Sequence, residues 1–347
     1  MSFRISGFSN SKCKIQEVVK TNLLTFEAFP EKVVLEGFDD QVLSGLGTFF
    51  ARISDGGVGD AAYRVVAVGG GGPRRSIEGA APHPRRPWHR HFRRDGEDVL
   101  VMPGGRVRLT PGRAKAVVEW TGTGAAVDGF AATALLEVAL GHALAMGGCV
   151  VNHAAALVVD GMELLVVGPS CAGKSTLSAA VLAAGGTVVS DDSVILGKDG
   201  DVVPCAGALR RNLWLREGGV ELLPETLRAR LWEAESMGER RWGLERAAAP
   251  ELFRTSVRPR AIVLLRRDLR VRGFTLQRVD SAEGLAGLIL ASSPLFLSGR
   301  YQVERERCMS GLLALVNGAP CFAVRMGRAL VEDPEVTVRR LFEDVCR

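Results

Sequence analysis

One short stretch constrains the fold of this chain more than any other. Residues 166–186 read VVGPSCAGKSTLSAAVLAAGG, in which Gly168, Gly173, Lys174 and Ser175 follow the spacing G-x-x-x-x-G-K-[ST]. The apolar run MELLVVG leads into this loop, and the Ala- and Leu-rich run STLSAAVLAA follows it and closes on two glycines. The pattern predicts a strand, a tight loop and a helix in that order. We therefore expect an α/β fold.

Each position of the loop has a mechanical task if the loop holds a phosphate. Gly168 and Gly173 let the backbone turn so that its N–H groups point at an anion, and the helix N-terminus adds its dipole. Lys174 can reach the β- and γ-phosphates of a nucleotide, and Ser175 can offer its hydroxyl to Mg²⁺. The chain has only seven lysines, so a lysine at this position is informative. We assign nucleotide binding to Gly168, Pro169, Ser170, Cys171, Ala172, Gly173, Lys174, Ser175 and Thr176.

The segments on either side of the loop narrow the class of nucleotide-binding protein further. Upstream, HAAALVVDGMELLVVG is two β-like runs joined by Asp160-Gly161, which is a strong hairpin signal. The strand that feeds the loop is therefore predicted to pair antiparallel with its predecessor. Downstream, GGTVVSDDSVIL places Asp191 and Asp192 at the end of a short apolar strand. Two carboxylates beside a phosphate site can divide the work between Mg²⁺ and the attacking hydroxyl.

Residues 152–196 resemble the core of the HPr kinase/phosphorylase family and its kinase-like relatives, which share a fold with phosphoenolpyruvate carboxykinases. A His ahead of a hairpin, the phosphate loop, a helix and a strand ending in Asp-Asp are that family's order. The resemblance implies a P-loop kinase core with a mixed sheet, and transfer of the ATP γ-phosphoryl group to a serine hydroxyl with Mg²⁺. It also implies catalysis by Asp191, Asp192, His153 and Lys174, and metal binding by Ser175 and Asp192. We assign the general base to Asp191.

Two departures from that family bear on the acceptor. Cys171 stands where the family usually has glycine, and no counterpart of the family's Gly-rich signature segment follows the Asp pair. These departures point away from HPr and toward a peptide, another protein or a small hydroxyl compound. A serine of a peptide or protein is our first hypothesis, and modification of a peptide natural product is one form of it. Two alternatives stay open: a kinase for free serine or another hydroxyl metabolite, and a nucleotide-binding relative without catalysis.

The part of the chain before the loop predicts a separate N-terminal α+β module over residues 1–127. Residues 98–120 hold three β-rich runs separated by turn residues, which predicts an antiparallel meander. Residues 69–94 are rich in Gly, Pro and Arg, and we interpret them as a mobile loop.

The second module is predicted over residues 128–347 and opens with a long apolar stretch at 129–151. This stretch is close to spanning length, but Glu137 and His142 lie inside it, and ionisable groups are costly at the centre of a bilayer. We therefore expect a buried helix at about 128–147 and no membrane contact. Two further apolar runs are expected to add strands to the sheet of the phosphate loop, at 260–267 and 320–328.

The composition limits the remaining possibilities for the kind of protein, its partners and its compartment. Of the 347 residues, 47% are hydrophobic and 24% charged, which describes a globular chain long enough for two domains. The net charge of +5 comes from an arginine-rich background, so we expect no nucleic-acid partner. The seven cysteines form no C-x-x-C pair and no signal-like segment opens the chain, which favours the cytoplasm. The fifteen arginines between 203 and 272 include candidates for the γ-phosphate that the sequence does not separate, and a homo-oligomer stays open.

Overall fold

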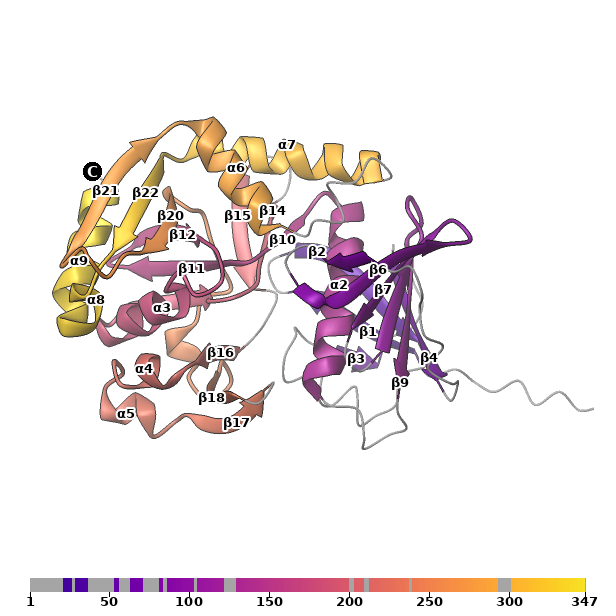
Figure 1. Cartoon of the computed structure of the whole chain (residues 1–347), viewed down its shortest axis with the longest axis horizontal. Helices are drawn as coiled ribbons and strands as arrows, with labels where there is room; N and C mark the ends of the chain where they lie inside the picture. The colour runs from indigo at the N-terminus through magenta and orange to yellow at the C-terminus, as the bar shows by residue number, and fades with distance from the viewer. Residues whose placement is uncertain are drawn as a thin grey trace, which may run out of the picture.

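The chain is a mixed α/β protein whose two parts lie on either side of one long helix, α2 (Gly129–Met146) (Figure 1). On one side lies a strand-rich N-terminal part, and on the other a part in which helices cover a sheet. The structure is a computed structural model, and it describes residues 21–26, 29–36, 53–55, 63–70, 81–83, 86–102, 105–121, 129–199, 203–208, 212–236, 239–292 and 301–346.

The N-terminal part is a mixed nine-stranded sheet with the order β3-β1-β2-β4-β9-β8-β7-β6-β5. The predicted meander is confirmed, because β7, β8 and β9 pair antiparallel in succession. The strands are β1 (Thr21–Phe26), β2 (Phe29–Glu36), β3 (Ile53–Asp55), β4 (Tyr63–Gly70), β5 (Ala81–His83), β6 (Arg86–Arg94), β7 (Glu97–Met102), β8 (Gly105–Leu109) and β9 (Lys115–Thr121).

The interpretation of residues 69–94 as a loop is wrong for much of that segment. Its first two residues end β4, and its second half forms β5 and β6 at one edge of the sheet. The reason is a cross-strand acid: Asp98 in β7 is 1% exposed and lies 3.0 Å from His91 Nε2 and 3.3 Å from Arg93 Nε, both in β6. Basic residues that composition assigns to a loop are thus paired within the sheet. Residues 71–80 and 84–85 lie outside the described residues.

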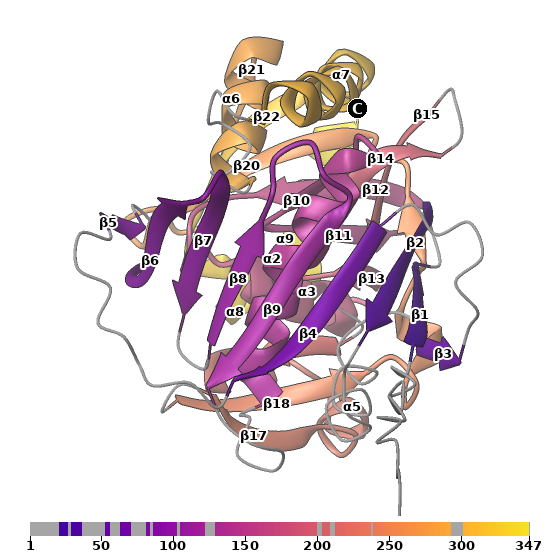
Figure 2. The same ribbon diagram turned by 90° about the vertical axis from the view of Figure 1, so that its right-hand side faces the viewer.

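Helix α2 packs against both parts of the molecule. It contacts β8 and β9 on one side and β10 (Val150–Asn152) and α7 (Gln302–Gly318) on the other. Figure 2 shows the strands of the first sheet side by side with α2 behind them. The expected buried helix is confirmed, with Leu136 and Leu140 fully buried. Within the described ranges, no helix is both long and apolar enough to cross a membrane. The boundary between residues 127 and 128 stays a prediction.

The second part is built on a six-stranded sheet with the order β13-β11-β12-β20-β22-β21. The predicted hairpin is confirmed: β11 and β12 pair antiparallel through Asp160 and Gly161, whose φ angles of 49° and 76° define the turn type that such hairpins prefer. The strands expected at 260–267 and 320–328 are β20 and β22, both parallel to β12. The strands are β11 (Ala154–Val159), β12 (Met162–Val167), β13 (Thr187–Ser190), β20 (Ala261–Arg267), β21 (Phe274–Val279) and β22 (Cys321–Met326).

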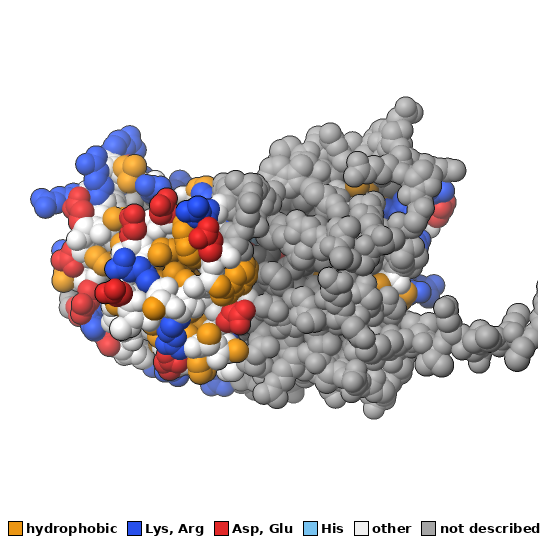
Figure 3. All heavy atoms as spheres, turned by 90° about the horizontal axis from the view of Figure 1, so that it is seen from below, with side chains coloured by type: hydrophobic (Ala, Val, Ile, Leu, Met, Phe, Trp, Pro, Cys, Tyr) orange, Lys and Arg blue, Asp and Glu red, His pale blue; other side chains and the backbone are white. Residues whose placement is uncertain are grey.

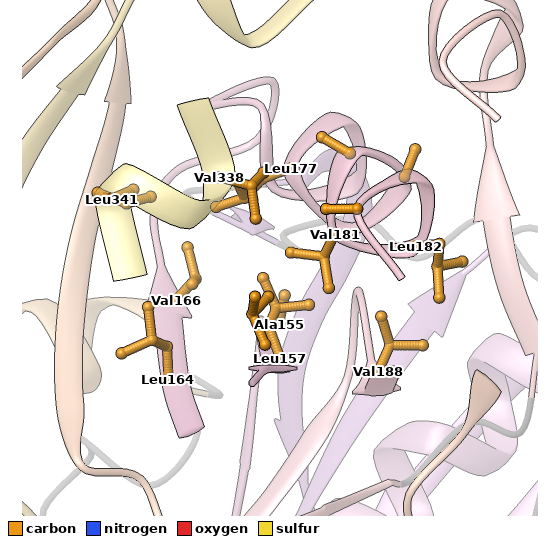
Figure 4. Close-up of a cluster of buried hydrophobic side chains, with 14 of the residues drawn as sticks. Ala155, Leu157, Leu164, Val166, Leu177, Val181, Leu182, Val188, Val338 and Leu341 are labelled. Carbon is orange, nitrogen blue, oxygen red and sulfur yellow. The ribbon is translucent and has the colours of Figure 1, made fainter. Parts of the chain in front are cut away.

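Helices cover both faces of this sheet because its central strands are apolar on both sides. On one face, Leu177 of α3 and Leu341 of α9 pack with Leu164 and Val166 of β12 (Figure 4). On the other, Leu288 of α6 and Leu312 of α7 belong to a second cluster. The remaining helices here are α3 (Lys174–Ala183), α6 (Ser281–Ala291), α8 (Ala329–Glu332) and α9 (Pro334–Cys346).

Two smaller sheets complete the second part. One has the order β10-β14-β15-β19 and the other β16-β18-β17. The elements are β14 (Val194–Asp199), β15 (Val203–Ala208), β16 (Asn212–Leu215), α4 (Glu217–Val220), α5 (Glu225–Arg228), β17 (Trp232–Ser236), β18 (Glu239–Glu245), η2 (Pro250–Leu252) and β19 (Ser256–Val257).

A buried histidine lies where α2 meets α7. His142 is fully buried, and its ring stands edge-on to Tyr301 with the ring centroids 5.6 Å apart. Burial lowers the pKa of His142 from 6.5 to about 4, although Glu304 and Asp98 act in the opposite sense. The unfolded chain therefore binds a proton at this residue between pH 6.5 and 4 that the folded chain does not.

We expect His142→Leu to remove part of the acid sensitivity of the fold. Since the folded pKa is the lower one, this residue's contribution is lost as pH falls from 6.5 toward 4. Between pH 7 and pH 5 the free energy of unfolding of the parent should fall by about 2 kcal/mol more than that of the variant. Urea denaturation at the two pH values measures this difference. Equal losses in parent and variant would contradict the assignment.

Candidate active site

The segments with predicted roles meet at one edge of the six-stranded sheet. Strands β12 and β13 both pair antiparallel with β11, so they run in the same direction and end at the same edge. Strand β11 starts at that edge, directly after His153, and β20 ends there because it is parallel to β12. The topology thus brings together His153, the Asp pair and the loop of residues 168–173, which the sequence predicts to bind phosphate and which we call the phosphate loop. The carboxyl ends of parallel strands are where α/β proteins bind ligands.

The phosphate loop connects β12 to α3 in a conformation that only certain residues tolerate. A Cβ atom on Gly168 would lie 2.5 Å from the carbonyl oxygen of Leu265 in β20, so the loop can leave the sheet here only through glycine. Gly173 has φ +100°, again a glycine conformation. Cys171 is exposed and has φ +63°, a left-handed conformation that non-glycine residues seldom adopt. This geometry explains why glycine suits the position of Cys171.

Lys174 begins α3 and folds back over the loop. Its Nζ donates to the carbonyl oxygens of Gly168 at 2.8 Å and Pro169 at 3.2 Å, and the residue is only 5% exposed. Burial lowers the pKa of the ammonium, while the charges of Asp192 and Asp191 act in the opposite sense. The lysine and both carboxylates are therefore close enough to interact electrostatically.

His153 and Asp192 are in direct contact. The Nδ1 atom of His153 lies 3.0 Å from both the backbone oxygen and Oδ1 of Asp192. Both partners are acceptors, so Nδ1 is the donor in this contact. The two aspartates differ in access: the side chain of Asp192 is 32% exposed, whereas Asp191 is 2% exposed.

Glu137, expected only as a charged residue inside an apolar helix, contacts the turn of residues 190–193, which carries the two aspartates. Ser193 donates from Oγ to Glu137 Oε1 of α2 at 2.6 Å. The hydroxyl of Ser190 donates to the backbone oxygen of Ser193 at 3.0 Å, which closes the turn that carries the two aspartates. Glu137 therefore positions the Asp turn from the helix that also packs on the N-terminal sheet. In the sequence, this role of Glu137 is indicated only by its charge within an apolar helix.

The other predicted binding residues lie in the loop or the first turn of α3. Pro169 and Ser170 are exposed, Ala172 is buried, and Ser175 and Thr176 are half-buried. The described ranges hold no group of three or more His, Cys, Asp or Glu side chains placed to bind a metal. Of the arginines left open by the sequence, Arg246 is buried and donates to the backbone oxygen of Val189 in β13 at 3.4 Å. That contact gives Arg246 a structural role beside the strand that ends at the Asp pair.

Comparison with known proteins adds little to this geometry. No protein-family model matches the chain, and no curated protein sequence is significantly similar to it. Among solved structures, the HPr(Ser) kinase/phosphatase from Coxiella burnetii is similar over 56% of this chain and 91% of its own, with 14% identity and a TM-score of 0.28. A likeness this weak does not assign the chain to that family.

We expect Gly168→Ala to destabilise the fold, because the added Cβ would meet the backbone of β20 at 2.5 Å. Separating β12 from β20 should lower the free energy of unfolding by roughly 1–3 kcal/mol. Gly218→Ala is the matched control, since a Cβ there has nothing within 4 Å. Urea denaturation of both variants makes the comparison. Equal stability of the two variants would show that the close approach to Leu265 has no energetic cost.

Proposed function

We propose that the chain is an ATP-dependent kinase that transfers the γ-phosphoryl group to a serine-type hydroxyl of a peptide or protein. One observation carries the proposal. A loop with a buried lysine, a pair of aspartates and a histidine share one edge of the sheet, and Lys174 lies over the loop with its Nζ on the carbonyl oxygens of Gly168 and Pro169. Phosphoryl transfer to a hydroxyl uses a cation that stabilises the phosphate charge and a carboxylate that accepts the hydroxyl proton.

The residues present fit a nucleotide with Mg²⁺. Ser175, in the first turn of α3, offers a hydroxyl, and the partly exposed Asp192 offers carboxylate oxygens. Mg²⁺ is usually held by one or two carboxylates together with substrate phosphates, so this donor set is sufficient. When bound, Mg²⁺ neutralises charge on the phosphates. His153 holds Asp192 in place through Nδ1.

The proposed reaction is one transfer of the γ-phosphoryl group from ATP to the acceptor hydroxyl. The acceptor oxygen attacks the γ-phosphorus, the bond from that phosphorus to the β,γ-bridging oxygen breaks, and ADP leaves with the bond's electrons. Asp191 accepts the hydroxyl proton as general base. Lys174 stabilises the negative charge on the transferring group. Glu137 acts through Ser193, and it is a positioning residue.

We expect Lys174→Ala to abolish transfer while the protein stays folded. The ammonium is a positioned cation, and its loss should lower turnover by about 10²-fold or more. Lys115→Ala is the control, because Lys115 is exposed and lies in β9 of the N-terminal sheet. Label transfer from [γ-³²P]ATP, with circular dichroism for folding, makes the measurement. A folded Lys174→Ala protein with the parent's turnover would refute the kinase function.

We expect Asp191→Asn and Asp192→Asn to fail in different ways. Loss of the metal ligand Asp192 should weaken binding of Mg-ATP, whereas loss of the base Asp191 should leave binding unchanged and slow turnover by about 10²–10⁴-fold. Asp95→Asn, in an exposed turn with φ 50°, is the matched control. Calorimetry of Mg-ATP binding and single-turnover kinetics separate the effects. Exchanged phenotypes would reverse the two roles, and parent-like behaviour of both variants would make the pair a simple turn.

The acceptor class is tested separately from the transfer itself. Labelled ATP is offered with serine-containing peptides and proteins in one reaction and with a pool of hydroxyl metabolites, free serine included, in another. We expect label in a peptide or protein. Efficient labelling of a metabolite alone would replace the peptide acceptor and leave the kinase standing, and nucleotide binding without any transfer would indicate a non-catalytic protein.

A further inference from the structure

A cluster of arginines lies beside the phosphate loop and has no part in the chemistry above. It consists of the end of β20 and the turn that follows, residues 266–272, together with Arg325 of β22 and Arg328 after it; we refer to it as the arginine turn. The residue before it, Leu265, is the one whose carbonyl oxygen lies against Gly168. The arginine turn therefore begins directly next to the start of the phosphate loop.

The arginine turn is held firmly by the end of β22. Asp268 N donates to Met326 O at 2.9 Å, Gly327 N to Gly273 O at 2.8 Å, and Ala329 N to Arg272 O at 2.7 Å. The contact is so close that a Cβ on Gly327 would clash with the backbone of the turn. These hydrogen bonds fix the backbone from which the arginine side chains extend.

The arginine turn concentrates positive charge on an exposed surface. Arg266 and Arg325 are register partners on neighbouring parallel strands, so two cations share one face of the sheet. Like charges at such positions repel each other, and an anion between them relieves the repulsion. The acids nearby are Asp268, which Arg270 engages through both carboxylate oxygens at 2.9 and 3.0 Å, and Glu332 and Asp333 of the helix α8 segment. The exposed arginines are Arg266, Arg267, Arg270, Arg272, Arg325 and Arg328.

Figure 3 shows Lys and Arg side chains together with Asp and Glu side chains at the left-hand end of the molecule, where β21, β22, α8 and α9 lie in Figure 1. The strand order β13-β11-β12-β20 places the Asp pair and the arginine turn on opposite sides of the phosphate loop. Neighbouring strands lie about 4.8 Å apart, so β13 and β20 are about 14 Å apart across the sheet. The ends of the two strands are farther apart than this, because Ser190 lies level with Ile262, and β20 continues beyond Ile262 to Arg267.

This separation bears on the size of the acceptor. A serine-sized molecule at the Asp pair cannot also reach the arginine turn, whereas an extended peptide of more than about five residues spans that distance. We propose that the arginine turn anchors acidic residues of a peptide or protein acceptor whose hydroxyl reaches the Asp pair. The proposal rests on the kinase function proposed above and narrows its acceptor to an acidic chain.

Direct binding tests the proposal without requiring phosphoryl transfer. The probes are a fluorescein-labelled deca-glutamate peptide and a labelled decathymidylate, titrated by fluorescence anisotropy at low salt, and Mg-ATP, titrated by calorimetry. The test variant is R266Q/R272Q/R325Q. The control R113Q/R228Q/R278Q removes the same charge from three exposed arginines elsewhere. We expect the test variant to bind deca-glutamate about tenfold more weakly than the control, and Mg-ATP equally well.

Three results would overturn the proposal. The first is absence of deca-glutamate binding, or equal weakening in both triple variants. The second is a parallel loss of Mg-ATP affinity, which would assign the arginines to the nucleotide. The third is decathymidylate binding that exceeds deca-glutamate binding and is lost in the test variant, which would assign them to nucleic acid. Failure of the kinase function is a separate outcome, because it is read from label transfer by the parent and by the Lys174→Ala protein.

Discussion

The antiparallel pairing of β11 with both β12 and β13 is the constraint on which the site depends. Because β11 runs against its two neighbours, its first residue lies at the edge where theirs end. His153 therefore meets the Asp turn across the start of β11, and the phosphate loop leaves the sheet at the same edge. A purely parallel sheet would place the start of β11 at the opposite edge, about 20 Å away for strands of this length.

The β11–β12 hairpin depends on the local sequence Asp160-Gly161 and on a contact with the C-terminal helix α9. Asp160 and Gly161 take positive φ angles that set the twist of the turn. Arg339 of α9 then donates to Asp160 Oδ2 at 2.6 Å and to the backbone oxygen of Ala184, after α3, at 3.1 Å. One guanidinium thus joins the hairpin, the helix that follows the phosphate loop, and the C-terminal helix. These contacts join the three elements at the end of the sheet opposite the candidate site.

Two partly buried polar contacts among the described residues join α2 and the N-terminal sheet to the second part of the molecule. Glu137 reaches the Asp turn from α2, and Gly112 N, in the turn between β8 and β9, donates to Glu304 Oε1 of α7 at 2.8 Å. Each of these hydrogen bonds favours the arrangement of the elements that it joins. Helix α2 therefore contacts both the first sheet and the turn that carries the two aspartates.

The sequence by itself determined the local features of the site. The strand, loop and helix around Gly168, the Asp160-Gly161 hairpin and the short strand before Asp191 follow from patterns within a few residues of each other, which act on the backbone directly. Only the tertiary structure decided the rest. Ser193 meets Glu137 across 56 residues of chain, Gly168 meets the backbone of Leu265 on a neighbouring strand, and the basic residues of β6 form a strand because Asp98 lies opposite. No local pattern contains such partners, because strand order and helix packing bring them together.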